Sequence, residues 1–189
     1  MPTTDNTFFH PGLSALELEA FDGLRAAQKL AHETATNAGW YTDRETGQPI
    51  ERNFGEVVAL MHSELSEALE AHRKNKARDD KLPHRAAIEV EFSDGILRIL
   101  DTAAATQIDV ASAMIPCLRH MTLYGDLPKR LPGVDQCAVN FANAIIRILE
   151  SSATRGYHQG GSVIDKNAFN RTRADHQLAN RAAEGGKRY

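Results

Sequence analysis

Apolar residues recur every three or four positions along most of the chain, and no segment alternates apolar and polar residues as a half-buried strand would. The stripe in the segment 53–74 consists of Val57, Met61, Leu65, Ala68 and Leu69. We expect helices over about residues 14–39, 53–74, 86–106, 134–153 and 162–183. This pattern predicts an all-α helical bundle that forms one domain over residues 1–189.

Capping residues support three of these helix starts. A Ser or Asn that is followed three positions later by an acidic residue is typical of a helix N-terminus. Such pairs are Ser14 with Glu17, Asn53 with Glu56, and Ser162 with Asp165. We therefore expect the last helix to begin at Ser162.

A second relation appears when the chain is compared with itself at an offset of 49 residues. Residues 81–101 and 130–150 then agree at eight of 21 positions, including a Leu-Pro pair ahead of each helix. Two amphipathic helices that share a stripe by chance would explain part of this likeness, but the Leu-Pro pair lies outside the stripe. We expect a duplicated helical hairpin, over residues 53–107 and about 112–155.

The acidic residues of the first hairpin are missing from the second one. The corresponding positions are Glu64 and Ala113, Glu67 and Pro116, Glu91 and Asn140, and Asp94 and Asn143. Because the apolar frame persists without these acids, they serve something other than folding. We therefore call the second hairpin degenerate.

Acidic residues in the first hairpin share helix faces. Glu64, Glu67 and Glu70 follow one another in steps of three, so their carboxylates lie close together and repel. Glu91 and Asp94 have the same spacing on the next helix, which a short turn makes an antiparallel neighbour. Both pairs border the apolar stripe, so four carboxylates can meet between the helices. Such a cluster costs several kcal/mol, or forces protonation, unless it is neutralised.

A hard divalent cation would offset this repulsion. Mg²⁺ prefers oxygen ligands at about 2.0–2.1 Å and keeps positions open for water and phosphate, and Mn²⁺ could take its place. The alternative is an acidic helix face in contact with water, near Arg73 and Lys74. We assign Glu70 and Glu89 to such a solvated face.

Composition narrows the function further. The chain has 189 residues, of which 42% are apolar, and a formal net charge of −3, so it offers no large basic surface to a nucleic acid polymer. Cys117 and Cys137 are too few for a disulfide framework. No segment approaches the ~20 apolar residues of a membrane span, and no signal segment is present. We expect a cytoplasmic protein.

Other kinds of site lack their motifs. None of the eight histidines follows an acidic residue by three positions, as a di-iron bundle requires, or has the spacing of a zinc site. The sequence also lacks a P-loop, a nucleophile elbow and a dinucleotide fingerprint. The hard-cation site remains.

Four segments together resemble a known family. The segments HSELSEALEAHR and EVEFSDGILRILD resemble the Glu-x-x-Glu and Glu-x-x-Asp metal signature of the all-α nucleoside triphosphate pyrophosphatases, in particular the MazG-like group. The flanking segments GWYTDRETGQPIERNFGE and KNAFNRTRADH are similar to those of phage and bacterial MazG-like proteins. The resemblance covers about residues 20–110 and 160–189. The degenerate hairpin is a departure, because many relatives are shorter there.

The resemblance implies Mg²⁺-dependent hydrolysis of a nucleoside or deoxynucleoside triphosphate to the monophosphate and pyrophosphate. Glu64, Glu67, Glu91 and Asp94 would hold one or more Mg²⁺ ions. One carboxylate would activate the attacking water. We favour Glu67 for this role, with Glu64 as the alternative.

Basic and aromatic residues would bind the substrate. Lys166, Asn170 and Arg173 have the spacing of one helix face, match the family's Lys…Asn-x-x-Arg segment, and suit phosphate oxygens; an ordinary solvated face is the alternative. Lys81, in the turn between the carboxylate helices, could also reach phosphate or be solvated. Trp40 begins the loop 40–52 and could stack on a base or anchor a helix end.

Other functions and the assembly stay open at this point. The chain could hydrolyse another pyrophosphate compound, such as an alarmone, or be a non-catalytic helical module with a structural metal. The resemblance implies a homo-oligomer, a dimer or tetramer. Apolar residues of the degenerate hairpin could pack within the chain or across a subunit boundary, namely Met114, Ile115, Ile145 and Ile146.

Overall fold

The computed structural model describes residues 13–176 and 178–182, and within them it confirms the all-α architecture. An isolated antiparallel bridge between Thr42 and Pro49 is the nearest approach to a strand in this part of the chain. The helices are α1 (Ala15–Asn37), α2 (Phe54–Arg73), α3 (Ala87–Ala105), α4 (Val110–Tyr124), α5 (Gln136–Ala153), α6 (Gln159–Thr172) and α7 (Leu178–Ala182), with a 3₁₀ turn, η1 (Ala174–His176).

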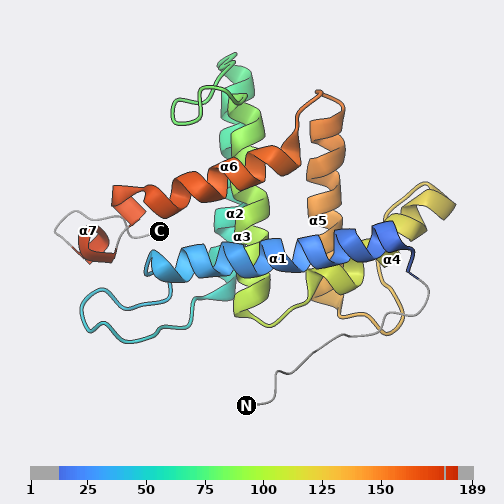
Figure 1. The fold of residues 1–189 in the computed structure, drawn as a ribbon, viewed down its shortest axis with the longest axis horizontal. Helices are drawn as coiled ribbons and strands as arrows, with labels where there is room; N and C mark the ends of the chain where they lie inside the picture. The colour runs from blue at the N-terminus through green and yellow to red at the C-terminus, as the bar shows by residue number, and fades with distance from the viewer. Residues whose placement is uncertain (1–12, 177, 183–189) are drawn as a thin grey trace.

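Helix α3 lies at the centre of the bundle and contacts α1, α2, α5 and α6. Helices α2 and α3 run side by side, whereas α1 and α6 cross them (Figure 1). The central position explains the apolar character of α3, whose Val90, Leu100 and Ala103 are completely buried. The polar residues on α3 are therefore exceptions that require a local explanation.

Caps at the helix starts follow local rules. Ser14 forms the expected capping box with Glu17, and Asn53 accepts a hydrogen bond from the backbone of Glu56. The expectation for Ser162 is wrong, because α6 begins three residues earlier, after His158. Ser162 is instead completely buried, and its hydroxyl accepts a hydrogen bond from Ser93 on α3.

Gly161 explains why this helix start was misplaced. The pair Gly160 and Gly161 suggests a chain break, yet both residues lie inside α6. A Cβ atom on Gly161 would come within 2.5 Å of His158 and 2.8 Å of Arg85. The glycine therefore permits close packing and does not end a helix.

The last expected helix also ends early. Helix α6 stops at Thr172, and Arg173 adopts an extended conformation. The chain then continues through η1 and the short α7. Residue 183, where the sequence analysis placed the helix end, lies outside the described residues.

The degenerate hairpin is formed by α4 and α5, which pack against each other. Helix α5 starts 49 residues after α3, at the offset of the sequence repeat. The four apolar residues left open by the sequence are all buried within the chain: Met114, Ile115, Ile145 and Ile146. They pack in the bundle core and are not available to a partner subunit.

Two residues of the α2 stripe do not lie in the core. Val57, Met61 and Ala68 are buried, whereas Leu65 and Leu69 are 40% and 46% exposed. The prediction was wrong for these leucines because α2 packs mainly against α3, so the apolar stripe is wider than the contact. No helix in the described residues has the length and apolar content needed to cross a bilayer.

Candidate metal and nucleotide site

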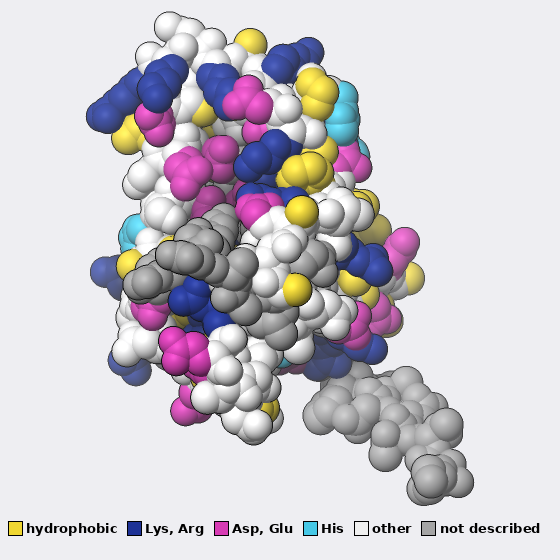
Figure 2. Space-filling view, turned by 90° about the vertical axis from the view of Figure 1, so that its left-hand side faces the viewer, with side chains coloured by type: hydrophobic (Ala, Val, Ile, Leu, Met, Phe, Trp, Pro, Cys, Tyr) yellow, Lys and Arg dark blue, Asp and Glu magenta, His cyan; other side chains and the backbone are white. Residues whose placement is uncertain are grey.

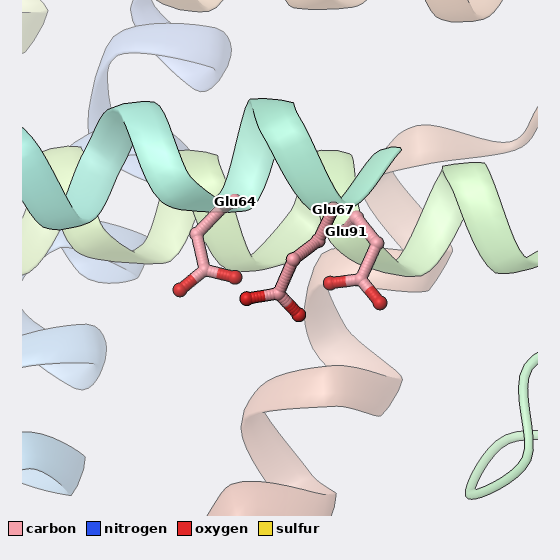
Figure 3. Close-up of side chains that lie close together, drawn as sticks. All are labelled: Glu64, Glu67 and Glu91. Carbon is pink, nitrogen blue, oxygen red and sulfur yellow. The ribbon is translucent and has the colours of Figure 1, made fainter. Parts of the chain in front are cut away.

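Three carboxylates meet where α2 lies beside α3. Glu64 and Glu67 project from consecutive turns of α2, and Glu91 projects from α3 to the same side of the hairpin (Figure 3). Each offers an oxygen atom within 4.8 Å of those offered by the other two. The cluster ranges from the buried Glu64 through the half-buried Glu91 to the exposed Glu67, so it is open to solvent on one side.

Glu64 is the most enclosed member of the cluster. It is 5% exposed, and its carboxylate accepts a hydrogen bond from the guanidinium of Arg98 on α3. Burial raises the pKa of Glu64; the Arg98 charge opposes this effect, and Asp94 and Glu67 add to it. The Arg98 contact therefore partly neutralises the cluster in the absence of a metal.

Glu91, on α3, has a raised pKa. Burial raises its pKa to about 7, and the nearby carboxylates of Asp94 and Glu67 add to the shift, while Lys166 opposes it. A carboxyl group that retains its proton near neutral pH lies where a cation would be stabilised.

Asp94 departs from the expected arrangement. The structure brings together three of the four expected acids, and the fourth, Asp94, is held by residues of α6. Lys166 Nζ lies 2.8 Å from Asp94 Oδ2, and the Asn170 amide donates to Asp94 Oδ1 over 3.4 Å. Lys166 is only 3% exposed. The sequence analysis missed this pairing because α6 is remote in sequence and reaches the site only by crossing α3.

All nine predicted site residues line one cavity of about 200 Å³ between α1, α3 and α6: Trp40, Glu64, Glu67, Lys81, Glu91, Asp94, Lys166, Asn170 and Arg173. On the face shown in Figure 2, acidic and basic side chains lie next to one another. The cavity thus brings the carboxylate cluster of the α2–α3 hairpin to the Lys-Asn-Arg segment of α6. This segment contributes although Arg173 lies beyond the helix end.

Trp40 both lines the cavity and takes part in local packing. The guanidinium of Arg181 lies 3.6 Å from the centre of its ring, and that of Arg52 lies 5.9 Å away. Arg181 also donates a hydrogen bond to the carbonyl of Ala38 at the end of α1. Part of the aromatic surface of Trp40 is therefore used by Arg181.

The remaining charged candidates differ in their surroundings. Lys81 is exposed in the turn before α3, and its backbone N–H donates to Asp79 Oδ1. Glu70 is exposed and pairs with Lys74, as expected for a solvated position. The same expectation is wrong for Glu89, which is buried because Arg85 pairs with it and because it caps the start of α3.

Several polar residues of the cavity were not among the predicted site residues, and three of them lie on α1 and α3. Arg98 and Asp101 lie four and seven positions after Asp94, on the same face of α3, and Thr34 lies opposite on α1. Polar residues at helical spacing on a largely apolar helix such as α3 are a signal that could have revealed the first two. Thr34 had no such signal, because its role depends on which helix faces it.

Asp101 has a hydrogen-bond network of its own. His32 Nδ1 donates to Asp101 Oδ1 over 2.8 Å, and the Tyr41 hydroxyl donates to the same oxygen over 2.9 Å. Burial raises the pKa of Asp101, while these hydrogen bonds oppose the increase. The pKa of Tyr41 is also raised, mainly by burial and further by the nearby charge of Asp101. The three side chains join α1, the loop 40–52 and α3.

The donor set suits a hard divalent cation. Glu64, Glu67 and Glu91 offer only oxygen atoms, and Asp94 lies beside them in the same cavity. Burial is the main cause of the raised pKa of Glu91, and the neighbouring carboxylates of Asp94 and Glu67 add to it. The open side of the cluster leaves room for water and a ligand.

Comparisons with protein-family models, curated proteins and solved structures found no match to this chain.

Proposed function

We propose that the protein is a Mg²⁺-dependent pyrophosphohydrolase that converts a nucleoside or deoxynucleoside triphosphate to the monophosphate and pyrophosphate, as the MazG-like resemblance implies. The observation that supports this proposal is the single cavity in which three convergent carboxylates face Lys166 and Asn170. Such a cavity suits a ligand that carries both a metal ion and negative charge.

Glu64, Glu67 and Glu91 would hold the metal, with Asp94 alongside. When bound, Mg²⁺ supplies positive charge that offsets the charge of the phosphate oxygens. Mn²⁺ would substitute for it, since both ions take oxygen ligands. The protein's own contribution is to hold these carboxylates ready on two rigid, packed helices.

Glu67 is the better candidate for the proton acceptor. Glu64 is buried and paired with Arg98, whereas Glu67 is exposed and has no hydrogen bond or ion pair with any described residue. An unpaired carboxylate can accept a proton from a water molecule while the oxygen of that water attacks the α-phosphorus. The bond from that phosphorus to the bridging oxygen breaks, and pyrophosphate leaves.

Residues of α6 would position the phosphates. Asn170 donates to Asp94 through its amide nitrogen, which carries a second N–H that would donate to a phosphate oxygen. Lys166 holds Asp94 in place and adds positive charge to the cavity wall. Arg173 lies at the same wall, where a guanidinium suits phosphate oxygens.

A nucleotide panel tests the proposal directly. Pyrophosphate release is measured for ribo- and deoxynucleoside triphosphates with Mg²⁺, with Mn²⁺ and with EDTA. Alarmones and nucleotide sugars are included to detect another pyrophosphate substrate. Glu67→Gln should abolish turnover with its helical content intact, whereas Glu70→Gln, one turn further along α2, should retain it. Absence of turnover with every compound would favour the non-catalytic module.

We also propose that the chain forms a homo-oligomer in the cytoplasm. Leu65 and Leu69 on α2 are exposed and would be suited to a subunit contact. Light scattering of the purified protein gives the mass in solution. A monomer at all concentrations would contradict this proposal without affecting the metal site.

A further inference from the structure

The cavity continues from the carboxylate cluster along the groove between α1 and α3. Its α3 wall consists of Asp94, Leu97, Arg98 and Asp101, which have the spacing of one helix face. Seven residues of helix span about 10 Å, so Asp101 lies about two helical turns from Asp94, at the end of the cavity that contains the carboxylate cluster. That separation is comparable to the length of a nucleoside.

The α1 side of this groove is lined mainly by small apolar side chains. It consists of Ala31, Ala35 and Ala38, whose side chains are single methyl groups, together with Thr34. Small side chains on one helix leave a slot between the two helices. A slot with one apolar wall, formed by these alanines, suits the face of an aromatic base.

Thr34 places an unsatisfied hydroxyl in this wall. Its side chain is only 8% exposed, and its Oγ1 atom has no hydrogen-bond partner among the described residues. A buried hydroxyl without a partner is unfavourable, because it has lost its hydrogen bonds to water and gained none in exchange. Because Thr34 lines the cavity, a ligand in the slot can supply the missing partner.

Asp101 offers a second polar group at the far end of the slot. Both hydrogen bonds that it accepts from described residues, those from His32 and Tyr41, end on Oδ1. The other carboxylate oxygen, Oδ2, accepts none from this part of the chain. A carboxylate fixed in this way is an acceptor for an N–H group of a ligand.

We propose that the slot between α1 and α3 binds the base of the nucleotide, and that Asp101 selects bases with an exocyclic amino group. This inference rests on the proposed function of the carboxylate site. An amino group can donate to Oδ2, as cytosine N4 does to carboxylates in DNA recognition. A carbonyl oxygen at the same place, as in uracil, can only accept and is repelled by the carboxylate.

His32 and Tyr41 act as positioning residues in this scheme. Each donates to Oδ1, which favours the ionised carboxylate and directs Oδ2 away from these two groups. Tyr41 also follows Trp40 directly, so the network fixes the start of the loop 40–52 against α3. Asp101 and the loop 40–52 are thus held together.

Binding in the absence of metal tests the slot separately from the chemistry. Equilibrium dialysis in EDTA compares CMP with UMP, and AMP with IMP, so that each pair differs at the amino position. We expect the amino compound to bind about ten-fold more tightly in at least one pair. Equal affinity within both pairs would overturn the inference.

Variants assign the preference to a residue. Asp101→Asn should remove or reverse it, since an amide can donate as well as accept. Asp22→Asn makes the same chemical change at an exposed position of α1 and should leave the preference unchanged. Thr34→Val should weaken binding of both members of a pair. A wild-type ratio in a folded Asp101→Asn protein would overturn the assignment.

Tyr41→Phe distinguishes selection from positioning. It removes one hydrogen bond to Asp101 but keeps the carboxylate, so the amino compound should still be preferred. Loss of the preference in Tyr41→Phe as well as in Asp101→Asn would mean that Asp101 only anchors the loop. If monophosphates bind selectively while no triphosphate is hydrolysed, the slot stands and the proposed function fails. If triphosphates are hydrolysed while neither pair is discriminated, the proposed function stands and the inference fails.

Discussion

Lys166→Met tests the buried ion pair that joins α6 to the carboxylate site. The Lys166 ammonium lies 2.8 Å from Asp94, and the two side chains are 4% and 19% exposed. Removing one partner of a buried pair typically costs about 3–5 kcal/mol, because the other charge is left uncompensated. Asp94 retains some contact with water, so we expect the low end, a loss of about 3 kcal/mol in the free energy of unfolding.

Urea denaturation followed by circular dichroism in EDTA measures this loss. Adding Asp94→Asn to Lys166→Met removes the orphaned charge and should restore most of the stability. Lys29→Met is the matched control, because Lys29 is highly exposed and pairs with Glu33 one turn away. Its expected change is below about 0.5 kcal/mol.

The effect of Mg²⁺ on stability should depend on Lys166. A site that has lost the Lys166 charge is more negative, so Mg²⁺ should stabilise Lys166→Met more than it stabilises the wild type. Two results would refute the reasoning: a loss below about 1 kcal/mol in the single variant, or a double variant no more stable than Lys166→Met.

Three further predictions concern titration, reactivity and packing. In EDTA, the stability of the folded protein should fall as pH rises from about 4.5 to about 7, because the raised pKa of Glu91 makes the folded state bind more protons than the unfolded state in this range. Thermal melts of Glu91→Gln should show a flatter pH profile, and a stability that rises with pH in both proteins would contradict this prediction. Burial raises the pKa of Cys117 to about 11, so a thiol reagent at pH 8 should label Cys137 first in the native protein, as mass spectrometry would show, and equal labelling rates would count against the packing described. Gly161→Ala should lower the free energy of unfolding by about 1–3 kcal/mol in urea melts, because its Cβ would displace the side chains of His158 and Arg85. In Gly160→Ala the new Cβ meets nothing within 4 Å, so the free energy of unfolding should rise by about 0.5–1 kcal/mol, and the opposite order of the two variants would refute the close packing at Gly161.

Local features of the fold were predictable from the sequence because they depend on residues close together in the chain. The caps at Ser14 and Asn53 need only a side chain and the backbone three residues later. The start of α5 followed from the repeat of the α3 pattern. Failures came where distant packing intervened, as at Ser162, which is buried against Ser93 and does not cap a helix.

The candidate site divides in the same way. Helical spacing alone places Glu64 beside Glu67 on one face of α2, and a short turn brings Glu91 opposite them. The pairing of charges was not predictable, because many arginines and lysines could compensate these acids. Arg98 pairs with Glu64, and Lys166 pairs with Asp94, because of how α2, α3 and α6 cross.

The sequence by itself therefore determined most of the helices, the repeat and the shared face of the acids, since each follows from periodicity and contacts within a few residues. The tertiary structure alone decided that Asp94 pairs with Lys166, that Leu65 is exposed, and that Thr34 and Asp101 line one slot. The physical reason is that burial, ion pairing and cavity shape depend on which helices meet, and the position of a residue along the chain does not specify that.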